Sequence, residues 1–321
     1  MKIAFAILFF TICILKISGQ PIPAKEENIP FLVTFGGNAD KSWGDDDFCQ
    51  IFFFVIPEDY KNPVYIRVFD PEVSGKYDEK KFAFNTKIKF SVYGGKSSFT
   101  HIDAQGVDPV GKYRSGNLLA EKIFYNNTKY DDKWYTFRPI SPTEGELSKV
   151  YGGYVIKIII QGISGDDGNL YRLYLSTKPN INESVEGSNS FTFEYSFRLH
   201  NNASEISHIY PYIDDKVISI KQSNFDWDND GKLYFVSVLR KAVEIKKSPN
   251  KKWVVSEHTI LEKEKNSSLD IQMHKNKTAN IHNNNVVFYI RNQYGEALPF
   301  YTIPIGGIPR PKSSIIIAPR K

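Results

Sequence analysis

The chain has 321 residues, of which 41% are hydrophobic and 24% are charged, and its formal net charge is +5 at pH 7. This length suggests about two domains, and the composition excludes a disordered protein or a coiled coil. No recognition motif for nucleic acid is present, so a nucleic-acid partner is not expected.

The N-terminus predicts a secretory signal peptide at residues 1–20. Lys2 precedes an apolar run from Ile3 to Leu15, and the small residues Ser18 and Gly19 follow it. The run is short for a stable anchor, so we expect cleavage and no integral membrane segment afterwards; an uncleaved N-terminal anchor is the alternative. The protein is therefore expected to be secreted, periplasmic or on the cell surface. Cleavage leaves Cys49 as the only cysteine, at the head of an apolar strand, where a buried structural thiol is expected.

Strand patterns dominate the chain up to about residue 200. Apolar and polar residues alternate in 86–95 and 191–199, which is typical of half-buried antiparallel strands. The runs 50–56 and 154–162 are almost wholly apolar and predict central strands covered on both faces, and 64–70 and 169–176 complete the series. These strands predict a first β-sandwich domain at 21–203.

A polar stretch at 200–208 marks the expected domain boundary. Beyond it, strands are predicted at 216–220, 232–239, 252–256 and 285–291, with 313–318 as a possible last strand. They suffice for a smaller β-sandwich at 204–321. The expected fold is all-β, with two antiparallel β-sandwich domains in tandem after the signal peptide.

The segment "DWDNDG" is a candidate calcium loop. Asp226, Asp228 and Asp230 alternate, and Gly231 stands where an EF-hand-like loop turns sharply. Ser237 replaces the bidentate Glu of the twelfth position, and no flanking helices are predicted. An Asp-rich turn between strands is the alternative.

Three more acidic clusters lie next to predicted strands of the first domain. Loops at one end of a sandwich meet in space, so these clusters are expected to share Ca²⁺, with ordinary turn chemistry as the alternative. The candidate ligands are Asp45, Asp46 and Asp47; Asp70 and Asp78, with Glu72 between them; and Asp166 and Asp167.

The first domain resembles the bacterial pre-peptidase C-terminal and C2-like β-sandwich domains. The segments "VYIRVFDPEVSGKYD", "TKIKFSVYGG" and "YVIKIIIQGISGDDGNLYRLYLS" carry this resemblance, which covers about residues 30 to 200. It implies a secreted accessory domain stabilised by calcium. No catalytic domain accompanies it here, and we identify no family for the segment after residue 205.

No catalytic motif is present: the six histidines lack metal-ligand spacing, and there is no GxSxG, P-loop or Rossmann fingerprint. Trp134, Trp227 and Trp253 are candidate ligand-binding platforms for sugar rings, or alternatively cover the core from the loops. N-x-[ST] sequons, which matter only in a eukaryotic secretory pathway, occur at Asn126, Asn182, Asn202, Asn266 and Asn276.

The expected function is non-enzymatic binding or adhesion at the cell envelope, with calcium-stabilised loops that recognise a protein or a glycan. One alternative is a carbohydrate-active enzyme or its carbohydrate-binding subunit. Another is a structural component of an envelope assembly. A deep cleft between two facing carboxylates would favour the enzyme, an exposed aromatic face would favour glycan binding, and a long uncovered edge strand would favour assembly.

Overall fold

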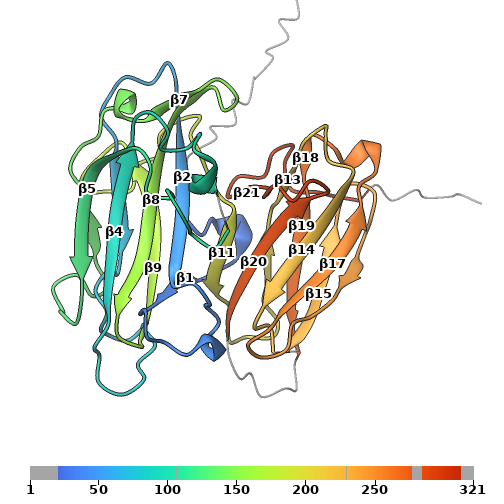
Figure 1. The fold of residues 1–321 in the computed structure, drawn as a ribbon, viewed down its shortest axis with the longest axis horizontal. Helices are drawn as coiled ribbons and strands as arrows, with labels where there is room; N and C mark the ends of the chain where they lie inside the picture. Colours follow the sequence, from blue (N-terminus) through green and yellow to red (C-terminus); the bar gives the residue numbers. More distant parts are fainter. Residues whose placement is uncertain (1–20, 106, 229, 277–283, 312–321) are drawn as a thin grey trace, which may run out of the picture.

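A computed structural model describes residues 21–311, except 106, 229 and 277–283 (Figure 1). The protein is all-β, as predicted: the described part contains 21 strands, and its helical segments are five 3-10 turns of three or four residues. No helix in this part is long and apolar enough to cross a membrane. The predicted signal peptide and the predicted strand at 313–318 lie outside the described residues.

The first half of the chain folds into two facing antiparallel sheets. One contains β11-β1-β9-β3-β6, and the other contains β10-β2-β8-β4-β5, with β7 also paired to β8. The strands are β1 (Phe31–Phe35), β2 (Cys49–Pro57), β3 (Tyr65–Phe69), β4 (Lys87–Gly94), β5 (Asn117–Phe124), β6 (Trp134–Thr136), β7 (Glu146–Ser148), β8 (Gly153–Ser164), β9 (Gly168–Ser176), β10 (Asn189–Thr192) and β11 (Glu194–Arg198).

The hydrophobic patterns produce these layers. Ile88, Phe90 and Val92 alternate along β4 and are fully buried between the two sheets, as the period of two predicts. In β2, neighbouring residues enter different buried clusters: Phe52 lies in the main core and Phe53 in a second cluster on the other face. This strand is therefore covered on both sides, as its apolar run predicts.

The predicted strand at 191–199 is divided between the two sheets. Its first part, β10, pairs with β2, and its second part, β11, pairs with β1, with Phe193 at the crossing point. The expectation of a half-buried strand with an exposed polar face is wrong here. Thr192 and Ser196 are each only 1% exposed, because a strand that passes between two layers is covered on both sides.

The second half builds two smaller layers. The strands β17-β14-β20 lie on one side and β12-β19-β15-β16 on the other, with a short β13-β18 pair beside them. Their bounds are β12 (Ile206–Ile209), β13 (Tyr212–Ile213), β14 (Ser219–Phe225), β15 (Gly231–Val236), β16 (Val243–Ile245), β17 (Trp253–Thr259), β18 (Ser267–Ser268), β19 (Asp270–Lys275), β20 (Asn285–Asn292) and β21 (Phe300–Tyr301).

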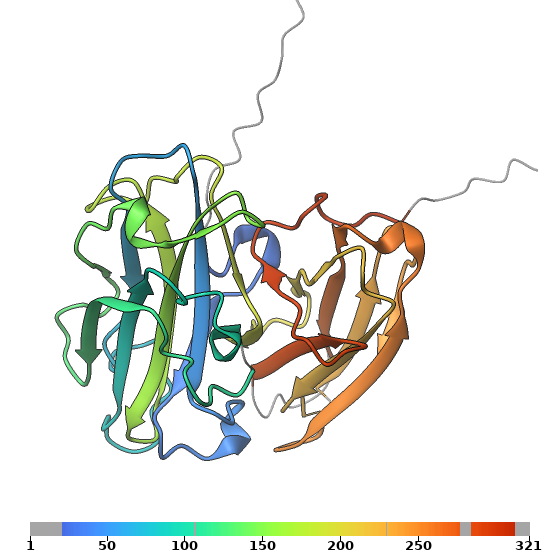
Figure 2. The same ribbon diagram turned by 45° about the horizontal axis from the view of Figure 1, so that its top comes forward.

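The two halves, side by side in Figures 1 and 2, are joined through their backbones. β20 pairs with β11, so one sheet of eight strands runs through both halves, and β21 returns to pair with β10 of the other sheet. The main buried cluster likewise contains residues of both, among them Phe52 and Phe235. The predicted boundary at 203/204 falls between β11 and β12, and the division into tandem domains stays a prediction.

Candidate functional site

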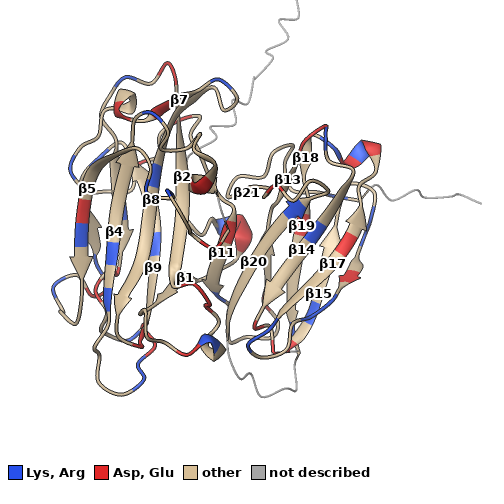
Figure 3. Cartoon of the chain, in the orientation of Figure 1, with Lys and Arg blue, Asp and Glu red and all other residues tan. Residues whose placement is uncertain are grey.

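The predicted acidic clusters of the first half do meet at one end of the sandwich. β2 begins, β3 ends and β9 begins at this end, because Cys49 pairs with Gln161 at the end of β8 and Phe69 pairs with Arg172 in β9. Figure 3 shows acidic residues in the loops at the lower end of both halves. The shared location follows the prediction; the contacts of the carboxylates show what they do there.

Asp167 organises the loop that leads into β4. Its carboxylate is fully buried and accepts hydrogen bonds from the backbone N–H groups of Lys81 (3.1 Å), Asn85 (2.8 Å) and Thr86 (3.2 Å). The neighbouring Asp166 accepts one from the side-chain Nδ2 of Asn85 at 2.9 Å. These donors have no strand partners at those contacts, so the carboxylate takes the place of a sheet neighbour.

Asp78 and Asp70 have a similar role beside β9 and β3. Asp78 accepts hydrogen bonds from the backbone N–H groups of Ser74 and Leu170, each at 2.7 Å. Asp70 accepts one from the backbone N–H of Asp132 at 3.0 Å. Burial, with the nearby negative charges of Asp131 and Asp132, raises the pKa of Asp70 to about 7.

The "DWDNDG" loop joins β14 to β15. A positively charged side chain from another strand lies beside its carboxylates. The Lys275 ammonium, on β19, lies 3.6 Å from Oδ2 of Asp230 and 4.9 Å from the ring centre of Trp227. Asp226 accepts a hydrogen bond from the backbone N–H of Lys251 at 2.6 Å. Burial lowers the pKa of Lys275 to about 8, and the carboxylate of Asp230 opposes this effect.

Gly231 does not have the role that the loop pattern predicts. It begins β15 and pairs with Lys275, and a Cβ atom there would lie 1.9 Å from the carbonyl oxygen of His274. The glycine is therefore required for close approach of two strands. The sharp turn is made instead by Asp226 and Asp228, whose φ angles are 57° and 58°.

These contacts give the predicted calcium ligands partners within the protein itself. An ion in the loop would have to share Asp230 with a buried ammonium, and the first-half carboxylates described above already accept backbone hydrogen bonds. Within the residues that the structure describes, no three His, Cys, Asp or Glu side chains are arranged to hold a metal ion. Calcium binding stays a prediction, for which the Discussion gives a test.

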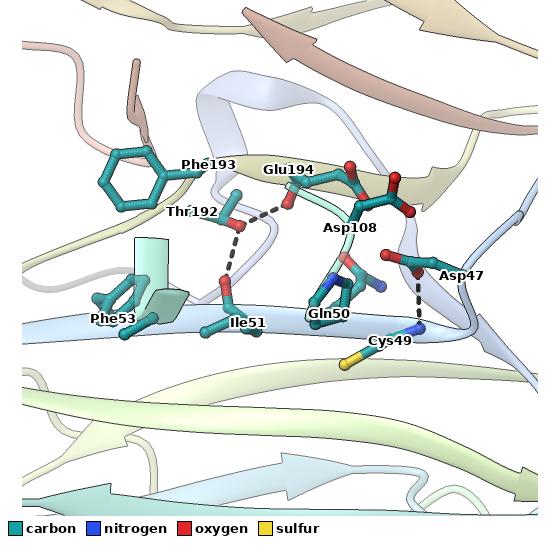
Figure 4. Close-up of a pocket in the computed structure, with 11 residues that line it drawn as sticks. Asp47, Cys49, Gln50, Ile51, Phe53, Asp108, Thr192, Phe193 and Glu194 are labelled. Carbon is teal, nitrogen blue, oxygen red and sulfur yellow. Dashed lines mark hydrogen bonds between the residues drawn. The ribbon is translucent and has the colours of Figure 1, made fainter. Parts of the chain in front are cut away.

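In the cluster Asp45–Asp47, Asp47 lines a small pocket where β2 begins (Figure 4). Asp45 is 1% exposed and accepts hydrogen bonds from the backbone N–H groups of Phe35 (3.2 Å) and Phe48 (2.9 Å). Burial raises its pKa to about 6.

Asp46 accepts a hydrogen bond from the indole Nε1 of Trp253 at 2.7 Å and so ties the two halves together. Asp47 accepts one from the backbone N–H of Cys49 at 2.9 Å.

Asp47 faces Glu194, at the start of β11, inside this pocket. Figure 4 shows their carboxyl groups and that of Asp108 turned toward the same space. Burial, together with the charges of the neighbouring carboxylates, raises the pKa of both Asp47 and Glu194 well above the ordinary value. The pocket holds only about 10 Å³, the least that one water molecule needs, so no sugar or peptide enters it.

Cys49 is a buried structural thiol, as predicted. It is 3% exposed, and burial raises its pKa well above the ordinary value, so the reactive thiolate is disfavoured.

The three predicted tryptophan platforms are engaged in packing. Trp227 is 0% exposed, so the prediction that a ligand stacks on it is wrong: the ring lies in the core. Trp134 is half-buried, with the Arg67 guanidinium 5.1 Å from its ring centre. Trp253 is half-buried and packs on Tyr289, with ring centres 4.7 Å apart.

An open groove lies between the two halves, at the opposite end from the acidic loops. Its volume is about 690 Å³, within the range of small-molecule sites in proteins. Tyr151 comes from the turn between β7 and β8, Tyr212 from β13 and Tyr301 from β21. In Figure 1, the strands β7, β13 and β21 all lie in the upper part of the molecule. Figure 2 turns the top of that view forward. Val55, Val150 and Ile305 add apolar surface.

The tyrosines form one aromatic wall. The rings of Tyr212 and Tyr301 are perpendicular, with centres 5.8 Å apart, and the centres of Tyr151 and Tyr301 are 6.5 Å apart. Asp214, Asp215, Lys216, Asn189 and Asn266 bring charged and amide groups to the same groove. Burial and then the two aspartates raise the pKa of Tyr212, so its hydroxyl stays protonated and can donate a hydrogen bond.

Sequence reasoning did not identify this groove. Its residues come from six separate segments, and only Asn266 belongs to a motif named from the sequence, the N-x-[ST] sequon. The available signal was weak: Tyr212 and Tyr301 occur next to or near prolines, in the short segments "YPYIDDK" and "LPFYTIP".

The fold and the groove define an all-β protein with an open aromatic site between two sandwich-like halves. No family model, curated protein or solved structure matches the chain.

Proposed function

We propose that the protein is secreted and binds a glycan in the tyrosine-lined groove, without catalysis. The groove itself supports this proposal: an open space of about 690 Å³ carries tyrosines from both halves beside carboxylate and amide groups. Aromatic faces cover the apolar faces of sugar rings, and acid and amide side chains bond the hydroxyl groups around them. The ligand is expected at the cell envelope, because the predicted signal peptide exports the chain.

The structure offers less support for the two alternatives, a carbohydrate-active enzyme and a structural component of an envelope assembly. The facing carboxylates that a glycosidase needs occur at Asp47 and Glu194, in a pocket too small for a sugar. In the groove, Asp214 and Asp215 are neighbours on one loop and do not approach a bond from opposite sides. The edge strand β5 exposes Leu118 and Ile123, but it also carries Glu121 and Lys122, and charges on an edge oppose strand-to-strand assembly.

A panel of immobilised oligosaccharides tests the proposal. The chain from residue 21 onward should bind at least one glycan, and Tyr212→Ala or Tyr151→Ala should weaken binding at least about tenfold, which corresponds to roughly 1.4 kcal/mol. Tyr125→Ala is the matched control, because Tyr125 is 50% exposed and does not line the groove.

Two results would count against the proposal. Glycan binding that persists unchanged in both groove variants would place the site elsewhere. Binding to envelope proteins but to no glycan, with the same sensitivity to the tyrosine variants, would keep the groove and change the class of ligand. Thermal unfolding of each variant verifies that the fold is intact.

A further inference from the structure

We propose that the protein carries N-linked oligosaccharides at Asn126, Asn182, Asn202, Asn266 and Asn276, and that the Asn266 glycan borders the tyrosine-lined groove. This goes beyond ligand binding and depends on export of the chain through a eukaryotic secretory pathway. In the reaction, Nδ2 of the asparagine forms a bond to the anomeric carbon of a lipid-linked diphosphate oligosaccharide. The bond from that carbon to the lipid diphosphate breaks, and the nitrogen loses a proton.

The exposure of the five asparagines supports the proposal. All five are exposed, whereas eight of the other fifteen asparagines in the described part are buried or half-buried. A glycan is large and polar, so each site must be on the surface of the folded protein. The sequence pattern does not require this, because a sequon can occur inside a buried strand.

The position of the sites in the fold agrees with this. Asn126, Asn182 and Asn202 lie in the connections β5–β6, β9–β10 and β11–β12; Asn266 lies between η5 (Glu262–Glu264) and β18; and Asn276 follows β19. A glycan at any of them displaces no strand partner. Asn202 accepts hydrogen bonds from the backbone N–H and the hydroxyl of Ser204 (3.0 and 2.8 Å) through Oδ1, not through the nitrogen that a glycan would modify.

Asn266 differs from the other four because it lines the groove. Ser268 of its sequon pairs with Tyr212 across β13 and β18, so the asparagine is two residues from the strand partner of a groove tyrosine. An oligosaccharide at Asn266 therefore reduces access to Tyr212. Glycosylation at this position then sets how open the groove is, whatever ligand it takes.

Mass spectrometry of the full chain from a eukaryotic secretory host tests the modification. The intact mass should exceed that of the unmodified chain, and peptide N-glycosidase should reduce it to that of the chain with each occupied asparagine converted to aspartate. Each single Asn→Gln variant should lose one glycan. Asn127→Gln and Asn201→Gln are matched controls, since each neighbours a sequon without being an acceptor, and they should lose none. A secreted chain with the unmodified mass would overturn the proposal.

Nitration of tyrosines tests the position of the Asn266 glycan. Because Asn266 has a φ of 55°, which Asn and Asp tolerate best, Asn266→Asp is the variant to use beside Asn266→Gln. Tetranitromethane should nitrate Tyr212 several-fold faster in either variant than in the glycosylated protein, and Asn202→Gln should have no effect. Equal rates in all four proteins would contradict the groove assignment while leaving the mass result intact.

Discussion

The two ends of the molecule use their polar residues in opposite ways. At the acidic end, carboxylates such as Asp167 and Asp78 accept hydrogen bonds from backbone N–H groups, and Asp230 faces a buried ammonium. At the groove, Asp215 and Asn266 are exposed beside aromatic rings. The carboxylates at the acidic end contact the protein's own groups, whereas those at the groove line an open space. The charged motifs that stand out in the sequence therefore support the fold through these contacts, and the open site, apart from the sequon residue Asn266, consists of residues that belong to no motif.

The largest expected effect on stability is the difference between removing an aromatic ring from the core and removing one from the groove. Trp227→Ala should lower the free energy of unfolding by about 3–5 kcal/mol, because it empties a fully buried position. Tyr212→Ala should cost less than about 1.5 kcal/mol, because the ring is only half-buried. Urea denaturation of both variants measures the difference. Equal losses would mean that the groove wall is part of the core.

The next effect concerns the acidic end alone. Asp167→Ala should destabilise the protein by about 2–4 kcal/mol, because three backbone N–H groups lose their acceptor. Asp166→Ala, the matched control, should cost less than about 1 kcal/mol, since its bond to Asn85 is exposed. A small effect at Asp167 in thermal unfolding would show that water replaces the carboxylate there.

A pH-dependent effect is expected at the Asp47 and Glu194 pocket. Burial raises both pKa values above those of the unfolded chain, so the folded state binds more protons and loses stability as the pH rises above about 4.5. Glu194→Gln removes one of these carboxylates. It should therefore stabilise the protein by about 1–3 kcal/mol at pH 7.5 and change little at pH 4.5.

Unfolding by urea at the two pH values, on both proteins, measures this difference. Glu186→Gln is the control, because Glu186 is exposed. A Glu194→Gln variant that is less stable than the natural chain at pH 7.5 would show that the ionised pair has a partner and is not merely buried.

The smallest expected effect is that of calcium. Because Lys275 faces Asp230, calcium should shift the unfolding temperature by less than about 1 °C relative to excess EGTA. An ion at one hundred times its dissociation constant would contribute about 2.7 kcal/mol, or roughly 4 °C for a chain of this size. A shift of that size, lost in Asp228→Ala, would contradict the interpretation of the acidic loops as hydrogen-bond acceptors.

Most of the layer structure could be predicted from the sequence, because the signal is local. Alternation along 87–94 and the apolar runs of β2 and β8 give the strands and their buried faces directly. The crossing at Phe193 could not be predicted in this way. A strand that changes sheets keeps its alternation, and what changes is the covering on its polar side, which depends on distant parts of the chain.

The sites were harder to predict for the same reason. The sequence indicates which loops carry carboxylates, but not that Lys275 lies 3.6 Å from Asp230 although 45 residues separate them in the chain. The groove needs Tyr151, Tyr212 and Tyr301 to meet, and no local pattern connects them. Proximity set by tertiary structure decided the role of each group.

The return of β20 and β21 to the first half has a consequence for synthesis. β10 and β11 leave the ribosome by residue 198, but their partners follow only at residues 285–301. At about 5–20 residues per second, both strands wait for roughly 5–20 s with open edges. Unpaired edges invite pairing with other chains, so the nascent protein needs shielding during this interval and is released safely only when nearly complete.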